Sequence, residues 1–186
     1  LMKRAGLRRA DLPRFVDELL KLGAKQVQVQ VNFPEADAML EDARGLLAGF
    51  DLGQIVIKIP ATRDGLRAGS VLSAGNVPVT YTAVYAPEQA HFAAQLGAAY
   101  AAPYLGRLQD SGVGGRALIT QMQSLLDRSG ADTRLLVASI RSRDTYLDML
   151  QIGVGAITIP PRLFGVLLDH DATLEAERAF LDDVAS

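Results

Sequence analysis

Short apolar runs alternate with amphipathic segments along the whole chain. The apolar runs have the length of β-strands, and the segments between them repeat apolar residues at helical spacing. We predict six strands, at residues 26–31, 54–60, 78–84, 99–104, 134–140 and 156–159. Successive strands start 21 to 35 residues apart, as in consecutive βα units. No linker-like stretch divides the chain, so the pattern predicts one α/β domain, residues 1–186, with parallel strands.

Helix starts between the strands have recognisable capping residues. Thr62 and Ser142 are suitable N-caps, because a side-chain oxygen can accept a hydrogen bond from a free N–H of the first turn. Pro87 fits the first turn of another helix, where its missing N–H costs nothing. The segment at residues 174–184 is acidic with spaced apolar residues, and it predicts a closing helix at the end of the chain.

The polar residues of the first strand decide between two architectures. In residues 26–31, three valines alternate with three glutamines. A doubly wound sheet has helices on both faces, so its strands are nearly continuous apolar runs. A barrel tolerates polar side chains on its inner face near the catalytic mouth. The sequence therefore predicts a TIM (β/α)8 barrel, of which this chain carries about six of the eight βα units.

Composition excludes several classes of protein. Of 186 residues, 49% are hydrophobic and the net charge is -2, which argues against disorder and against nucleic-acid binding. No apolar run reaches the ~18 residues that would span a bilayer. With no cysteine, the chain has no disulfide, thiol nucleophile or cysteine-based metal site. No spacing of histidines or acids indicates a metal, and we expect a cytoplasmic protein.

Lys58 is the candidate nucleophile. It lies in an otherwise apolar strand, where alternation places Ile57 and Ile59 on one face and Lys58 with Val56 on the other. Burial among apolar neighbours lowers the pKa of an amine, and a neutral amine can attack a carbonyl to form an imine. The alternative is a strand-end lysine that pairs with a carboxylate.

Polar side chains also occur at the ends of the other strands. Thr82 lies in the third strand, Tyr104 ends the fourth, and Ser139 closes the fifth. Two arginines accompany them, Arg107 and Arg141, whose guanidinium groups match the geometry of a phosphate. In a barrel, the active site is assembled at these carboxyl ends of the strands.

The two arginines have an alternative interpretation as ordinary ion pairs. Asp110 follows Arg107 by three residues, and Asp144 follows Arg141 by three. Pairing with such acids would leave neither guanidinium available for an anion.

Taken together, four segments resemble the transaldolase family, and within it the small fructose-6-phosphate aldolase-like branch. They are IVIKIPAT at 55–62, VTYTAVY at 79–85, APYLGR at 102–107 and VASIR at 137–141, and the likeness runs from roughly residue 1 to 183. The resemblance implies a class I aldolase barrel, with no metal or organic cofactor, that forms closed homo-oligomers. The family's first strand carries an aspartate and its second ends in Thr-Thr-Asn-Pro. Neither motif occurs here, so we expect the first two strands to be missing from this sequence.

The resemblance also implies residue roles. Lys58 would form the Schiff base, and Gln30 and Thr82 would position a catalytic water. Tyr104 stands where the transferases usually have Phe, and Gln30 where they usually have Glu, so both residues favour the aldolase branch. Arg107, Ser139 and Arg141 would bind the phosphate of a sugar.

We therefore expect cleavage of fructose 6-phosphate to dihydroxyacetone and glyceraldehyde 3-phosphate. One alternative is a transaldolase, which passes the three-carbon unit between sugar phosphates in the pentose phosphate pathway. Another is a catalytically silent phosphosugar-binding or assembly subunit. The expected partners are a sugar phosphate and further copies of the chain, with no nucleic acid and no membrane.

Overall fold

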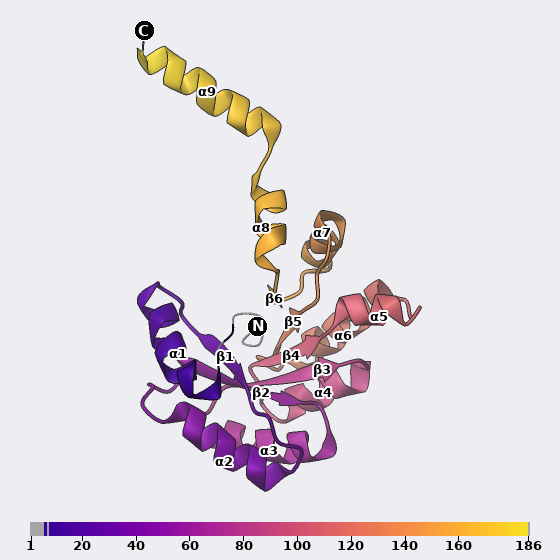
Figure 1. Ribbon diagram of the computed structural model, residues 1–186. Helices are drawn as coiled ribbons and strands as arrows, with labels where there is room; N and C mark the ends of the chain where they lie inside the picture. Colours follow the sequence, from indigo (N-terminus) through magenta and orange to yellow (C-terminus); the bar gives the residue numbers. More distant parts are fainter. Residues whose placement is uncertain (1–5, 7, 186) are drawn as a thin grey trace.

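The computed structural model describes Gly6 and residues 8–185, which form a curled sheet of six parallel strands flanked by helices (Figure 1). The strands are neighbours in chain order, from β1 to β6. Their bounds are β1 Val27–Gln30, β2 Ile55–Pro60, β3 Val79–Val84, β4 Tyr100–Pro103, β5 Arg134–Val137 and β6 Ala156–Ile157. The six predicted strands and the partial (β/α) barrel are thus confirmed.

Helices connect the strands in the alternating order that the sequence predicts. A 3₁₀ turn, η2, lies at Arg9–Asp11. The α-helices that follow are α1 Leu12–Lys21, α2 Ala36–Leu47, α3 Arg63–Ala74, α4 Pro87–Gln95, α5 Leu105–Asp110, α6 Gly115–Ser129, α7 Arg143–Ile152, α8 Pro161–Leu168 and α9 Asp171–Ala185. Thr62 caps α3 by accepting from the Gly65 N–H at 3.1 Å, and Ser142 caps α7 by accepting from the Thr145 N–H at 3.2 Å. Both predicted caps are confirmed.

The two faces of the sheet have separate cores. One large apolar cluster lies between the sheet and the helices and includes Ile55, Ile57, Ile59 and Tyr81. A small second cluster lies on the other, concave face and consists of Val56, Tyr100, Ala102 and Leu136. Alternate residues of one strand thus join different clusters, as the period of two requires.

The C-terminal helix α9 extends away from the sheet (Figure 1). It begins at Asp171 and carries exposed apolar side chains, Leu174, Phe180 and Leu181 among them. The helix itself is confirmed, but it does not close against the sheet. No helix in the part of the chain that the structure describes is long and apolar enough to cross a membrane.

Candidate functional site

Lys58 lies on the concave face of β2, beside the polar residues of two neighbouring strands. Its register partners are Gln30 on β1 and Thr80 on β3. The side chain is half-buried, and burial lowers the pKa of its amine from the ordinary value of 10.5. Among the described residues it has no hydrogen bond and no ion pair, so the alternative of a carboxylate-paired lysine finds no partner there. An amine of this kind is chemically available as a nucleophile.

Two hydroxyl groups meet on the same face, near the carboxyl ends of β3 and β4. The oxygens of Thr82 and Tyr104 are 2.6 Å apart, a hydrogen-bond distance, and Thr82 is 1% exposed. Deeper on the concave face, the Thr80 hydroxyl donates to Gln28 Oε1 at 3.1 Å. These four polar groups therefore satisfy one another in pairs, as buried polar groups must.

Arg107, in the first turn of α5, is held by aromatic rings. Its Nη1 donates to the Tyr85 hydroxyl at 3.2 Å. Its guanidinium carbon lies 4.8 Å from the centre of the Tyr104 ring, a cation–π contact. Tyr85 and Tyr104 meet edge to face, with ring centres 6.0 Å apart. The hydrogen bond from Arg107 to Tyr85 raises the pKa of this already strongly basic group.

Arg141 follows β5 and pairs with Asp110 at the end of α5. Its Nη1 and Nη2 donate to the two carboxylate oxygens at 2.6 and 2.7 Å, and Arg141 holds the pKa of Asp110 below its ordinary value. The ion-pair interpretation thus holds for Arg141, with Asp110 rather than Asp144 as the acid. Among the described residues, Arg107 has no acidic partner.

Ser139 and Arg141 both pack closely around Gly106. A Cβ added to Gly106 would lie 2.6 Å from Ser139 Oγ and 2.7 Å from Arg141 Nε. The glycine is therefore required by close approach of these two side chains. It also shows that Ser139 and Arg141 converge on the start of α5, which carries Arg107.

Two backbone irregularities shape the carboxyl ends of the strands. Ala83 has a φ of 55°, and the β3–β4 register shifts between Thr82 and Val84. Ser139 has a φ of 67°, and β5 ends at Val137, three residues before the predicted end. Non-glycine residues at positive φ are uncommon and concentrate at functional sites. Here they flank the hydroxyl pair and the predicted anion site.

Tyr85 is a residue of the site that the sequence pattern missed. Strict alternation places Tyr85 on the same face as Tyr81, which the helices cover. The bulge at Ala83 reverses the alternation, because Val84 joins the helix-side core and leaves Tyr85 on the side of Tyr104. An aromatic residue after a strand is too common a pattern to have predicted this.

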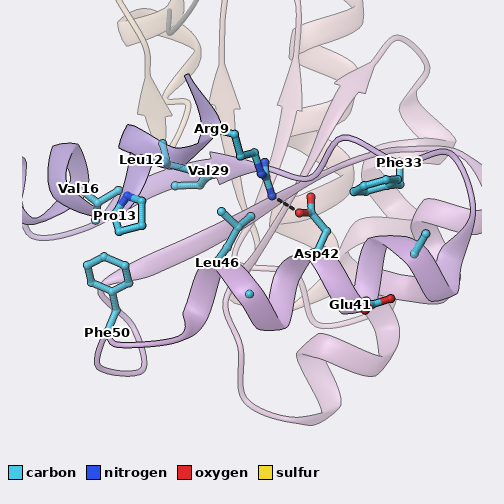
Figure 2. A pocket seen from close by; sticks show the side chains of 12 residues that line it. Arg9, Leu12, Pro13, Val16, Val29, Phe33, Glu41, Asp42, Leu46 and Phe50 are labelled. Carbon is cyan, nitrogen blue, oxygen red and sulfur yellow. Dashed lines mark hydrogen bonds and ion pairs between the residues drawn. The ribbon is translucent and has the colours of Figure 1, made fainter. Parts of the chain in front are cut away.

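A cavity of about 460 Å³ between α1 and α2 is separate from these residues (Figure 2). It lies on the helix-covered side of β1, where Val29 lines it, and an ion pair between Arg9 and Asp42 stands at its edge. None of the predicted site residues lines it. No group of three or more metal-ligating His, Asp or Glu side chains occurs within Gly6 and residues 8–185.

Known proteins resemble almost the whole chain. The family described as Transaldolase/Fructose-6-phosphate aldolase matches residues 11–185. A "Probable transaldolase" of Ruegeria pomeroyi is 34% identical over 184 residues, which cover 99% of this chain and 82% of the relative. A "Probable transaldolase" of Coprothermobacter proteolyticus is 36% identical over 169 residues, 90% of this chain and 76% of the relative. The chain therefore belongs to the transaldolase/fructose-6-phosphate aldolase family and is an enzyme of the transaldolase type.

Proposed function

We propose that this protein is a Schiff-base (class I) aldolase that reversibly cleaves fructose 6-phosphate to dihydroxyacetone and glyceraldehyde 3-phosphate. The observation that carries the proposal is the environment of the Lys58 amine. Its amine is half-buried on the concave face, lacks a partner among the described residues and has a lowered pKa. The two hydroxyl groups of Thr82 and Tyr104 lie at the same end of the sheet.

The chemistry begins when neutral Lys58 attacks the ketone carbon C2. Loss of water leaves a protonated imine, whose nitrogen draws electrons. The C3–C4 bond then breaks, its electron pair moves toward the imine to give an enamine, and the C4 hydroxyl loses its proton as the aldehyde forms. Protonation of the enamine at C3 and addition of water to C2 release dihydroxyacetone and regenerate the amine.

Tyr104 supplies the proton to the enamine, through a water positioned by Thr82 and Gln30. A phenol both gives and takes a proton, whereas the amide of Gln30 does not titrate. The 2.6 Å contact between Thr82 and Tyr104 supports this arrangement, because it fixes the phenol at the carboxyl end of β4. The family resemblance assigns the proton of the C4 hydroxyl to the aspartate of the family's first strand.

Arg107, Ser139 and Arg141 bind the phosphate. The close packing of Ser139 and Arg141 around Gly106 supports this assignment, since Arg107 follows in the same helix. Arg107 has the less neutralised charge of the two arginines, because Asp110 already offsets Arg141.

Borohydride trapping tests the proposal directly. Incubation with fructose 6-phosphate and borohydride should attach the sugar to Lys58, as identified by peptide mass spectrometry, and Lys58→Met should abolish the adduct. A matched control is Lys25→Met, which removes an exposed lysine and should leave trapping unchanged. A Lys58 variant that keeps full activity would falsify the mechanism.

A transaldolase activity is the second candidate, and the names of the curated relatives favour it. The two activities share the imine and differ in the fate of the enamine. Product analysis separates them, since free dihydroxyacetone formed without an acceptor aldehyde indicates an aldolase. Turnover that requires erythrose 4-phosphate indicates a transferase.

The same proposal includes a cytoplasmic, homo-oligomeric enzyme. The absence of cysteine is consistent with a reducing compartment. Phe180 and Leu181, 68% and 66% exposed on α9, support contact with another copy. Sedimentation of the wild type and of Phe180→Ser tests this: a smaller assembly in the variant supports the contact.

A further inference from the structure

The two arginines of the site are held in different ways. Arg141 makes two charge-assisted hydrogen bonds to Asp110, so a carboxylate both orients and offsets it. Among the described residues, no acid orients Arg107 or offsets its charge. Its guanidinium is fixed instead by one hydrogen bond to Tyr85 and by the face of the Tyr104 ring.

Tyr85 is itself anchored before any ligand arrives. Its backbone N–H donates to Gln89 Oε1 at 2.8 Å, and Gln89 Nε2 donates to the Ala61 carbonyl at 3.2 Å. These bonds tie the residue after β3 to the end of β2 and to the first turn of α4. Edge contact with Tyr104 orients the ring. Its hydroxyl is therefore a fixed acceptor, although the side chain is 38% exposed.

We propose that Tyr85 is a positioning residue for phosphate binding, whose hydroxyl accepts a hydrogen bond from Arg107 and holds the guanidinium against Tyr104. This rests on the proposed function, in which Arg107 binds the phosphate. A guanidinium has five N–H donors, and Tyr85 uses one of them, which leaves the others for the anion. A side chain oriented in advance loses less freedom on binding, and the affinity is higher as a result.

The test is Tyr85→Phe, which removes the acceptor and keeps the ring. The reaction is run in the synthetic direction, with dihydroxyacetone as donor and either glyceraldehyde 3-phosphate or glyceraldehyde as acceptor. We expect KM for the phosphorylated acceptor to rise about three- to tenfold, from the loss of a hydrogen bond to a charged but exposed group. kcat, and KM for glyceraldehyde, should stay within about twofold.

Two further variants make the result specific. In an Arg107→Leu background, Tyr85→Phe should have no additional effect on KM, because the interaction is already lost. Tyr146→Phe is the matched control: this tyrosine lies in α7, packs against the helix-side core and should show wild-type kinetics. Equal changes with both acceptors, or effects that add to those of Arg107→Leu, would overturn the assignment.

A binding measurement separates this inference from the proposed function. The dissociation constant of inorganic phosphate, measured by calorimetry without turnover, should rise by the same factor in Tyr85→Phe. If the wild type forms no borohydride adduct at Lys58 but the variant still weakens phosphate binding, the aldolase mechanism fails and the role of Tyr85 stands. If phosphate binds both proteins equally, or binds neither, the role of Tyr85 is wrong.

Discussion

The two faces of the sheet differ in which side chains they carry, apolar on the helix-covered face and partly polar on the concave face. On the helix-covered face, Ile55, Ile57 and Ile59 are each 0% exposed and belong to one continuous apolar cluster. On the concave face of the same strand, Val56 is followed by Lys58, and the neighbouring strand contributes Thr80. Isoleucine, valine and threonine are all common in strands, so β-propensity does not explain the difference between the two faces. The difference comes from what covers each face.

Stability and chemistry are thus carried by different residues of one strand. Burying a polar side chain without a hydrogen bond costs free energy, so the helix-covered face consists mainly of packed apolar groups. The concave face contains polar pairs such as Thr82 with Tyr104, and it leaves the amine of Lys58 unpaired. A substitution on the concave face should therefore affect mainly activity, and a substitution on the helix-covered face should affect mainly stability.

Lys58→Met should have the largest effect, on activity alone. We expect kcat to fall at least about a thousandfold, because no imine forms without the amine. The free energy of unfolding should stay equal or increase, since methionine is apolar and of similar length, and the lysine loses no bonded partner within the described residues. Initial rates and urea unfolding measure the two quantities. A large loss of stability in this variant would contradict the separation of the two faces.

Ile57→Ala should have the converse effect. Removing a fully buried side chain from the helix-covered face should lower the free energy of unfolding by about 2–5 kcal/mol. Borohydride labelling of Lys58 should persist in the fraction that stays folded. Val71→Ala, at a residue 55% exposed on α3, is the control and should change stability by less than about 0.5 kcal/mol. Urea denaturation followed by circular dichroism makes the measurement.

Much of this two-faced arrangement is readable from the sequence. The alternation around Lys58 and the valine–glutamine pattern of β1 follow from the period of a strand, and the caps at Thr62 and Ser142 are local. These features need only the identity of neighbouring residues. That is why the six strands and the partial barrel were predictable.

The carboxyl ends of the strands were less predictable, because the backbone departs from its period there. Ala83 and Ser139 adopt positive φ values, which cannot be predicted from their residue types. The bulge at Ala83 changes the face on which Tyr85 lies, and no local signal reveals its contact with Arg107, 22 residues away. The pairing of Arg141 with Asp110 joins residues 31 apart, so the sequence could offer it only as an alternative.

Gly69→Ala tests how tightly the helix-covered face is packed. A Cβ on Gly69 would lie 2.2 Å from the Tyr81 hydroxyl, which donates to the Leu66 carbonyl. The variant should lose about 1–3 kcal/mol of stability through overpacking. Gly45→Ala is the matched control, because Gly45 is also inside a helix but has no atom within 4 Å of its added Cβ. It should gain about 0.5–1 kcal/mol from helix propensity, and equal thermal shifts in the two variants would contradict this packing.

The smallest effect is the pH dependence that Lys58 gives to both activity and stability. Because burial lowers its pKa below 10.5, the neutral amine is available at lower pH than for a free lysine. We expect kcat/KM for fructose 6-phosphate to rise with pH and to level off below 10.5. A plateau at or above 10.5 would show that the attacking amine is not desolvated.

The same shift has a defined sign in stability. Between the lowered pKa of the folded state and 10.5, the unfolded chain binds more protons at Lys58 than the folded chain does, so stability rises with pH. Below that window the cost of burying the ammonium is fully present, and it disappears as both states become neutral. Because Lys58→Met has no such group, the wild type should gain stability relative to it across the window, by less than about 1.4 kcal/mol per pH unit. Urea unfolding of both proteins from pH 7 to 10.5 measures this difference, and a difference that falls with rising pH would mean that the folded state stabilises the ammonium through a partner.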